Sequence, residues 1–156
     1  MERSHRHRRF PRICTQAPPP GRNPPKGLTL LILDTDIAVD LLRGFPPATI
    51  WLAANAHQQI GLPGFVVMEL IQGCFNQREV TKVQNFIQPF HVLWPTPDVA
   101  DQALAVYARG RLSHSLGLLD ALIGQLALSM NLPLHTFNQK HFAAIPTLQT
   151  LQPYTR

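Results

Sequence analysis

The segment Leu28–Leu33 (LTLLIL) constrains the fold most, because five of its six residues are apolar and a carboxylate follows at once. A run this short, preceded by Gly27 and ended by acids, is typical of a buried strand. Strands that are buried on both faces occur in parallel sheets, where helices cover the sheet. We therefore expect a parallel sheet built around this segment, with Asp34 at the carboxyl end of its strand.

The rest of the chain alternates helical and strand patterns. Apolar spacing and helix-ending residues predict helices at 36–43, 47–55, 65–74, 79–88, 98–111 and 118–130. Short apolar segments predict further strands at 59–62, 91–94, 134–136 and 148–151. The helix at 118–130 has the clearest apolar stripe, formed by Leu119, Leu122, Ile123, Leu126, Ala127 and Met130. Strands separated by helices indicate βαβ units, and so an α/β fold with a central parallel sheet.

The net charge of +5 comes from the first part of the chain. Residues 1–27 carry seven Arg or Lys residues and one acid, whereas residues 28–156 carry seven basic and eight acidic residues. The first segment is rich in Pro and lacks apolar periodicity, so we expect a disordered basic tail at 1–27. It also lacks the apolar segment of a secretory signal. Residues 28–156 are then expected to form one nearly neutral domain.

The Cys and His residues of the chain form neither the pattern of a metal cluster nor that of a disulfide framework. Cys14 and Cys74 have neither pattern, which indicates a reducing, cytoplasmic environment. The histidines His114, His135 and His141 lack the spacing of zinc ligands, so structural roles are expected for them. Apolar runs are too short to span a bilayer, and no membrane association is expected.

Polar side chains fall at the carboxyl ends of the predicted strands. Asp34 ends the first strand, and Glu69 lies in the first turns of the helix after the second. Asp120 lies at the start of helix 118–130, and Asn138 follows strand 134–136. Sites in open α/β sheets form at these strand ends. We therefore expect the four side chains to share one rim of the sheet.

Clustered carboxylates repel one another, and burial raises their pKa values. A divalent cation such as Mg²⁺ relieves this repulsion, because it prefers oxygen ligands and commonly bridges carboxylates and phosphates. A bound cation also activates water and neutralises charge on a phosphodiester. The sequence therefore indicates phosphodiester hydrolysis at an acidic rim.

Simpler roles fit some of these acids. Asp120 fits a first-turn acid that the helix dipole stabilises. Asp36 fits either a helix cap, with Thr35 as its competitor, or a group that supports the metal site from behind. Asp40 is expected to pair with Arg43, three residues later on the same helix. Glu69 is harder to explain in this way, because an acid beside an apolar stripe needs a partner.

Four segments, in this order and spacing, closely resemble the PIN-domain ribonucleases, and most closely the VapC-type toxins of toxin–antitoxin pairs. The segments are LILDTDIAVDLLRG, VVMELIQG, LGLLDALIGQLAL and LHTFNQKHF. The resemblance covers Leu28 to about Tyr154. It implies a PIN-like three-layer fold, in which helices flank a central parallel sheet, and a metal-dependent cleavage of RNA.

The resemblance also implies roles for single residues. Asp34, Glu69 and Asp120 match the acidic site that binds Mg²⁺ or Mn²⁺ in this family. Thr136 matches a small hydroxyl residue of the fourth motif, and Asn138 stands where many relatives have a fourth acid. Family members usually form homodimers and are neutralised by a small cognate antitoxin protein. The neutral Asn138 and the tail at 1–27 depart from the family pattern.

Two other functions fit parts of the sequence. A degenerate PIN domain that only binds RNA or a protein partner is favoured by Asn138. A haloacid dehalogenase-type phosphotransferase is suggested by Asp34-Thr35-Asp36, because such enzymes attack phosphate with the first Asp of a similar stretch. That class also needs a late acidic pair, and the chain has no acid after Asp120.

Overall fold

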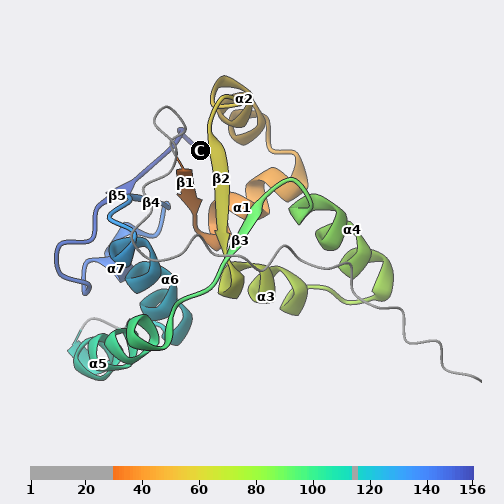
Figure 1. Cartoon of the computed structure of the whole chain (residues 1–156). Coiled ribbons are helices and arrows are strands. Elements are labelled where there is room, and N and C mark those ends of the chain that lie inside the picture. The colour runs from red at the N-terminus through yellow and green to blue at the C-terminus, as the bar shows by residue number, and fades with distance from the viewer. Residues whose placement is uncertain (1–29, 114–115) are drawn as a thin grey trace, which may run out of the picture.

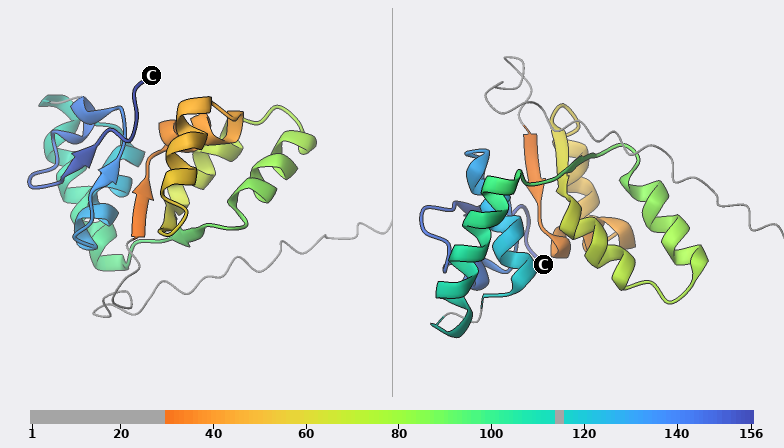
Figure 2. Two further views of the ribbon diagram at one scale, coloured as in Figure 1. Left: turned by 90° about the horizontal axis from the view of Figure 1, so that it is seen from above. Right: turned by 60° about the horizontal axis from the view of Figure 1, so that its bottom comes forward.

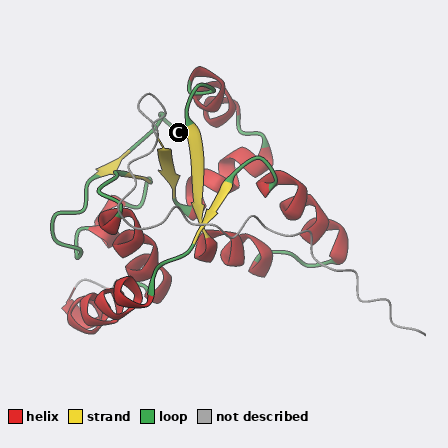
Figure 3. Ribbon diagram, viewed as in Figure 1, coloured by secondary structure: helices red, strands yellow, loops and turns green. Residues whose placement is uncertain are grey.

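A computed structural model describes residues 30–113 and 116–156. These residues form a five-stranded parallel sheet surrounded by seven helices (Figures 1 and 3). The strands are β1 (Leu30–Leu33), β2 (Gln59–Pro63), β3 (His91–Leu93), β4 (Leu134–His135) and β5 (Thr150–Leu151). The helices are α1 (Thr35–Arg43), α2 (Pro46–Ala54), α3 (Gly64–Gln72), α4 (Gln77–Ile87), α5 (Pro97–Ser113), α6 (Leu118–Ser129) and α7 (Gln139–Phe142).

The strand order is β3-β2-β1-β4-β5, and every neighbouring pair is parallel. The chain moves outward in one direction from β1 to β3, and then returns past β1 to form β4 and β5. Since crossovers between parallel strands are right-handed, this reversal puts the later helices on the opposite face of the sheet. Figure 2 shows α1 to α4 on one side of β1 and α5 to α7 on the other. The predicted three-layer α/β fold is therefore confirmed.

The core forms around β1, as the opening apolar run predicts. Leu31, Ile32 and Leu33 are buried, and Ile32 and Leu33 are fully enclosed. In α6, Ala121 and residues 123–127 are buried, whereas Leu119, Leu122 and Met130 of the predicted stripe are only partly buried. Gln125 belongs to this buried surface, and its side-chain amide donates a hydrogen bond to Gln102 of α5 (2.8 Å). The α5 helix therefore supplies an acceptor for the amide N–H of Gln125, whereas Gln125 Oε1 is buried without a hydrogen-bond partner among the described residues.

Most predicted elements are present with ends shifted by one or two residues. One difference is larger, because α7 was not predicted. The strands β4 and β5, at two residues each, are one and two residues shorter than expected. The predicted tail at 1–27, Cys14 and His114 lie outside the described residues. Among the residues that the structure describes, no helix is long and apolar enough to cross a membrane.

Gly44 ends α1 in the left-handed conformation, with φ of 72°. Its N–H donates to the carbonyls of Asp40 and Leu41, and a Cβ at this position would contact nothing within 4 Å. Gly44→Ala should therefore lower the free energy of unfolding by about 1 kcal/mol, through backbone strain alone. Gly44→Asn should lower it less, because Asn tolerates this conformation. Urea unfolding of the three proteins measures the difference, and equal stability of Gly44→Ala and the wild type would contradict it.

Candidate active site

The candidate site lies where the strand order reverses. The chain leaves β1 in one direction and β4 in the other, so the carboxyl ends of these two neighbouring strands meet at the switch point, where open α/β sheets form a binding crevice. Asp34 directly follows β1, and Thr136 directly follows β4. The backbone N–H of Asp34 donates to the carbonyl of His135 (3.0 Å), which ties the two strand ends together.

Asp34 is the most buried acid of this crevice, with 5% of its surface exposed. Its Oδ1 accepts a hydrogen bond from the N–H of Thr35 (2.7 Å), so Asp34 is the N-cap of α1. Its Oδ2 accepts from the hydroxyl of Thr136 (2.7 Å), although 102 residues separate them. The pKa of Asp34 is raised from 3.8 to about 7, chiefly by burial. The charges of Asp36 and Asp120 contribute to this rise, and the hydrogen bond from Thr136 opposes it.

Glu69 is connected to the site by a hydrogen bond from Thr35, the residue after Asp34. The hydroxyl of Thr35 donates a hydrogen bond to Glu69 Oε2, which joins the start of α1 to α3. This is the partner that an acid beside an apolar stripe requires. Pro63 and Gly64 shape the turn into α3 without a side-chain cap, and a Cβ on Gly64 would lie 2.4 Å from Trp94. The close approach of Trp94 therefore requires Gly at the start of this helix.

Asp120 lies at the start of α6 and faces α7. Its Oδ2 accepts a hydrogen bond from the N–H of Gly117 (3.3 Å), which is the first-turn role that the sequence also allowed. The same oxygen lies 3.2 Å from His141 Nδ1. That nitrogen also lies 2.8 Å from the side-chain amide of Asn138. A protonated Nδ1 donates to Asp120, whereas an unprotonated one accepts from Asn138.

His141 is thus a site residue that the sequence analysis missed, since a purely structural role was expected for it. The signal was its position three residues after Asn138, which places both side chains on one face of a helix. This spacing is informative only within a helix, and the sequence analysis did not predict α7. His135, in contrast, is buried, and its Nδ1 lies 3.1 Å from the carbonyl of Ile32. The structural role expected for His135 is therefore confirmed.

Thr136 and Asn138 complete the rim after β4. The hydroxyl of Thr136 donates to Asp34 and accepts from the N–H of Asn138 (2.9 Å). A continuous chain of hydrogen bonds therefore runs from Asn138 through Thr136 to Asp34. The side-chain amide of Asn138 points the other way, toward His141 of α7.

The predictions for Asp36 as a cap and for Asp40 are wrong. Asp34 caps α1, and Asp36 Oδ2 instead accepts a hydrogen bond from the N–H of Phe137 (2.9 Å). Asp36 therefore supports the loop after β4, and the role expected for it behind a metal site stays a prediction. Asp40 pairs not with Arg43 but with two residues near the end of the chain, Tyr154 and Arg156. Both contacts are tertiary, and helical spacing could not reveal them.

The oxygen atoms of these side chains are suitable ligands for a hard cation that keeps part of its water shell. Among residues 30–113 and 116–156, no three His, Cys, Asp or Glu side chains form a ready-made cage. The available ligands are oxygens, and the charges of Asp36 and Asp120 raise the pKa of Asp34. A divalent cation would relieve this repulsion with few protein ligands and several waters, which is the coordination typical of Mg²⁺. Asp34 and Asp120 would hold it directly, with Glu69 beside them.

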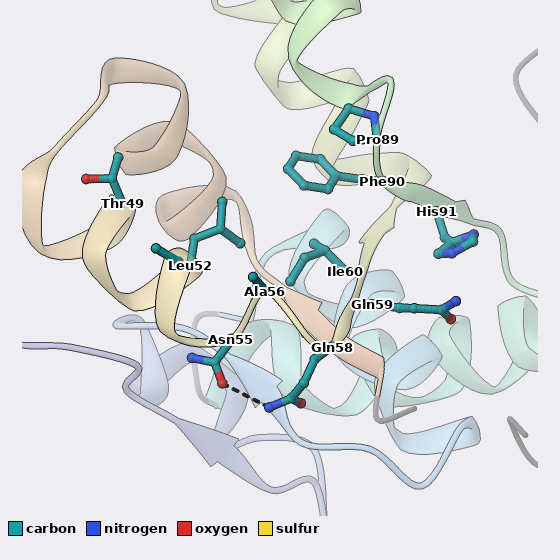
Figure 4. A pocket seen from close by; sticks show the side chains of 11 residues that line it. Thr49, Leu52, Asn55, Ala56, Gln58, Gln59, Ile60, Pro89, Phe90 and His91 are labelled. Atoms are coloured by element: carbon teal, nitrogen blue, oxygen red, sulfur yellow. Dashed lines mark hydrogen bonds between the residues drawn. The ribbon is translucent and has the colours of Figure 1, made fainter. Parts of the chain in front are cut away.

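A groove of about 610 Å³ lies at the other end of the sheet (Figure 4). It is lined by the end of α2, by Gln59 at the start of β2 and by His91 at the start of β3. Asn55 and Gln58 are joined across its edge by a hydrogen bond of 2.9 Å. Asp, Glu, Lys and Arg are absent from its lining. The groove is therefore separate from the acidic rim and has no carboxylate in its lining.

Comparison with known proteins shows the family of this chain. The PIN domain model matches residues 31–148. Ribonuclease VapC19 of Mycobacterium tuberculosis is 34% identical over 123 residues, which are 76% of this chain and 96% of that protein. Ribonuclease VapC10 of the same species is 31% identical over 126 residues, which are 80% of this chain and 92% of that protein.

Solved structures agree on the fold. A toxin–antitoxin complex from Klebsiella pneumoniae contains a chain with a TM-score of 0.64 and 26% identity, and the match covers 81% of this chain and 99% of that chain. A DNA-bound VapBC structure from Salmonella typhimurium gives a TM-score of 0.69 at 23% identity, covering 81% and 98%. The family match also replaces the phosphotransferase interpretation of Asp34-Thr35-Asp36. The chain belongs to the PIN-domain family, and VapC ribonucleases are among its relatives.

Proposed function

We propose that this chain is a metal-dependent endoribonuclease and the toxin of a type II toxin–antitoxin pair. One observation carries the proposal: Asp34, Glu69 and Asp120 come from three distant segments and belong to one hydrogen-bonded rim at the point where the strand order reverses. Two relatives that share about a third of their residues with this chain are named ribonucleases. Mg²⁺ or Mn²⁺ is the cofactor that the oxygen ligands favour.

Each residue of the rim has a distinct role in this proposal. A bound divalent cation supplies positive charge for the phosphodiester and a water of lowered pKa. Asp34 and Asp120 hold it, and Thr136 fixes the carboxylate of Asp34 through its hydroxyl. Thr35 orients Glu69 toward the same rim. Asn138 contributes a neutral amide, so the site carries one negative charge less than a site with four acids.

The test is cleavage of a mixed RNA pool by the purified full chain. We expect cleavage with 5 mM Mg²⁺ or Mn²⁺, loss of cleavage with EDTA, and recovery when the cation is restored. Cleavage that continues in EDTA would contradict the metal site. Binding of RNA without cleavage under all conditions would favour the degenerate PIN domain, for which Asn138 is the best argument.

Thr35→Val should reduce RNA cleavage by about tenfold, because Glu69 then loses its hydroxyl donor. Thr35→Ser retains the hydroxyl and should remain close to the wild-type rate. Both variants keep the Thr35 N–H that Asp34 caps, so their thermal unfolding should change little. A Thr35→Val protein that cleaves as fast as Thr35→Ser would contradict the positioning of Glu69.

The proposed partners are RNA and a cognate antitoxin protein, both in the cytoplasm. Several solved structures that share this fold are structures of VapBC or of a toxin–antitoxin complex. An antitoxin for this chain is proposed by analogy with them. Co-expression with the short reading frame beside its gene, followed by co-purification and recovery of cell growth, tests this partner.

We also propose a homodimer. Three large apolar side chains are exposed on neighbouring elements: Met68 on α3, Trp94 after β3 and Leu118 at the start of α6. Exposed apolar side chains on elements that pack together are typical of an interface. Sedimentation should give a dimer for the wild type and a monomer for Met68→Lys, while Ile50→Lys on α2, at 70% exposure, serves as the control. A wild-type monomer at 50 µM would contradict the dimer.

A further inference from the structure

The segment Tyr154–Arg156, here called the C-terminal segment, is bound to α1. The hydroxyl of Tyr154 donates a hydrogen bond to Asp40 Oδ2 (2.8 Å), and Arg156 Nε donates to the same oxygen (2.9 Å). Arg156 Nη2 also donates to the backbone carbonyl of Asp36 (3.1 Å). One guanidinium group therefore contacts two successive turns of α1, the helix that Asp34 caps.

The same guanidinium covers the loop after β4. Arg156 Cζ lies 4.2 Å from the ring centre of Phe137, and the rings of Phe137 and Tyr154 pack edge to face at 5.0 Å. The N–H of Phe137 donates to Asp36 Oδ2 (2.9 Å). The C-terminal segment, Phe137 and α1 thus form a closed set of contacts. A shift of Phe137 relative to α1 would break several of them together.

Phe137 lies between the two residues that complete the rim. Thr136 before it donates to Asp34, and Asn138 after it donates its N–H to Thr136. We propose that Arg156 is a positioning residue for the nuclease site: it holds the loop Thr136–Asn138 against α1, so that Thr136 and Asn138 keep their places beside Asp34. This inference rests on the proposed function for its catalytic meaning, while the contacts that carry it are independent of that function.

Arginine suits this role because its planar group can donate in two directions while its face lies on an aromatic ring. The Nε and Nη2 donors serve different acceptors, and the face of the same group covers Phe137. A lysine ammonium can reach the carboxylate of Asp40 but cannot make all three contacts at once. Arg156→Lys should therefore rescue the function only in part.

The experiment measures the binding of Mn²⁺ alone to the full chain, by electron paramagnetic resonance, in the wild type, Arg156→Ala and Arg156→Lys. The direction of the change in Mn²⁺ affinity distinguishes a positioning role of Arg156 from an effect of its charge alone. Removing a positive charge near an acidic rim should strengthen the binding of a cation. Loss of positioning should instead weaken it, by about tenfold for Arg156→Ala. Arg43→Ala removes the same charge from the exposed end of α1 and is the matched control.

Hydrogen exchange of the Phe137 amide gives a second readout that needs no cation. We expect faster exchange at Phe137 in Arg156→Ala, with the amides of β2 unchanged, and neither change in Arg43→Ala. Equal or tighter Mn²⁺ binding by Arg156→Ala would overturn the positioning role, and so would an unchanged Phe137 amide. If the wild type neither binds Mn²⁺ nor cleaves RNA, the proposed function fails, and the exchange of Phe137 alone decides whether Arg156 positions the loop.

Discussion

Asp34→Asn should lower the rate of RNA cleavage by a factor on the order of 10² to 10³, which is the loss typical when one electrostatic group is removed from a preorganised site. Asn keeps the size of the side chain and an acceptor for the N–H of Thr35, so the cap of α1 survives. It removes the charge that would hold the cation most directly. The loss should therefore appear in catalysis and in Mn²⁺ binding, and the fold should remain.

The matched control is Asp101→Asn, which makes the same chemical change at an exposed position of α5. It should cleave RNA at the wild-type rate. Single-turnover cleavage at saturating Mg²⁺ compares the two variants, and circular dichroism checks that both are folded. If Asp34→Asn retains more than a tenth of the wild-type rate, Asp34 is not the main metal ligand.

The same substitution should make the protein more stable at alkaline pH when no divalent cation is present. The pKa of Asp34 is about 7 in the folded chain, against 3.8 for an ordinary Asp, chiefly because the carboxyl is buried. A raised folded-state pKa means that the stabilising contribution is complete below pH 3.8 and is lost as the pH rises through 7. Between pH 5 and pH 8 the loss is on the order of 3 kcal/mol.

Urea unfolding in EDTA at pH 5 and pH 8 measures this loss. The difference in stability between Asp34→Asn and the wild type should increase by that amount at the higher pH, and Asp101→Asn should show no such increase. Other titrating groups, such as the buried His135, cancel in the comparison of variants at one pH. Added Mg²⁺ should restore stability to the wild type at pH 8 and leave Asp34→Asn unaffected. A difference that is independent of pH would contradict a buried, protonated Asp34.

The fold was predictable because its signals are local. The apolar run before Asp34 predicts β1, Gly44 ends α1, and the alternation of helices and strands predicts the parallel sheet. The strand-end rule also brought Asp34 and Asn138 to the same rim, since their strands β1 and β4 are neighbours. These predictions needed only periodicity, turn residues and strand direction.

The remaining contacts of the site could not be predicted, because each joins residues that only the folded chain brings together. Asp36 bonds to Phe137, 101 residues away, and Asp40 bonds to Arg156, 116 residues away. In the sequence, Asp36 lies beside Thr35, the competing cap, and Asp40 lies three residues before Arg43. Arg43 is exposed to water, whereas the distant partners are fixed by packing of the end of the chain on α1.

The position of β4 in the sheet has a consequence for the timing of synthesis. The strand β1 is among the first parts of the described chain to be made, and its neighbour β4 follows about a hundred residues later. Until then one edge of β1 has no strand beside it, and Asp34 lacks the hydroxyl of Thr136. Since contacts of such long sequence separation form late, the nascent chain can fold its first three strands on the ribosome before the site exists. The proposed nuclease site is therefore completed only after β4 has paired with β1 and Thr136 has reached Asp34.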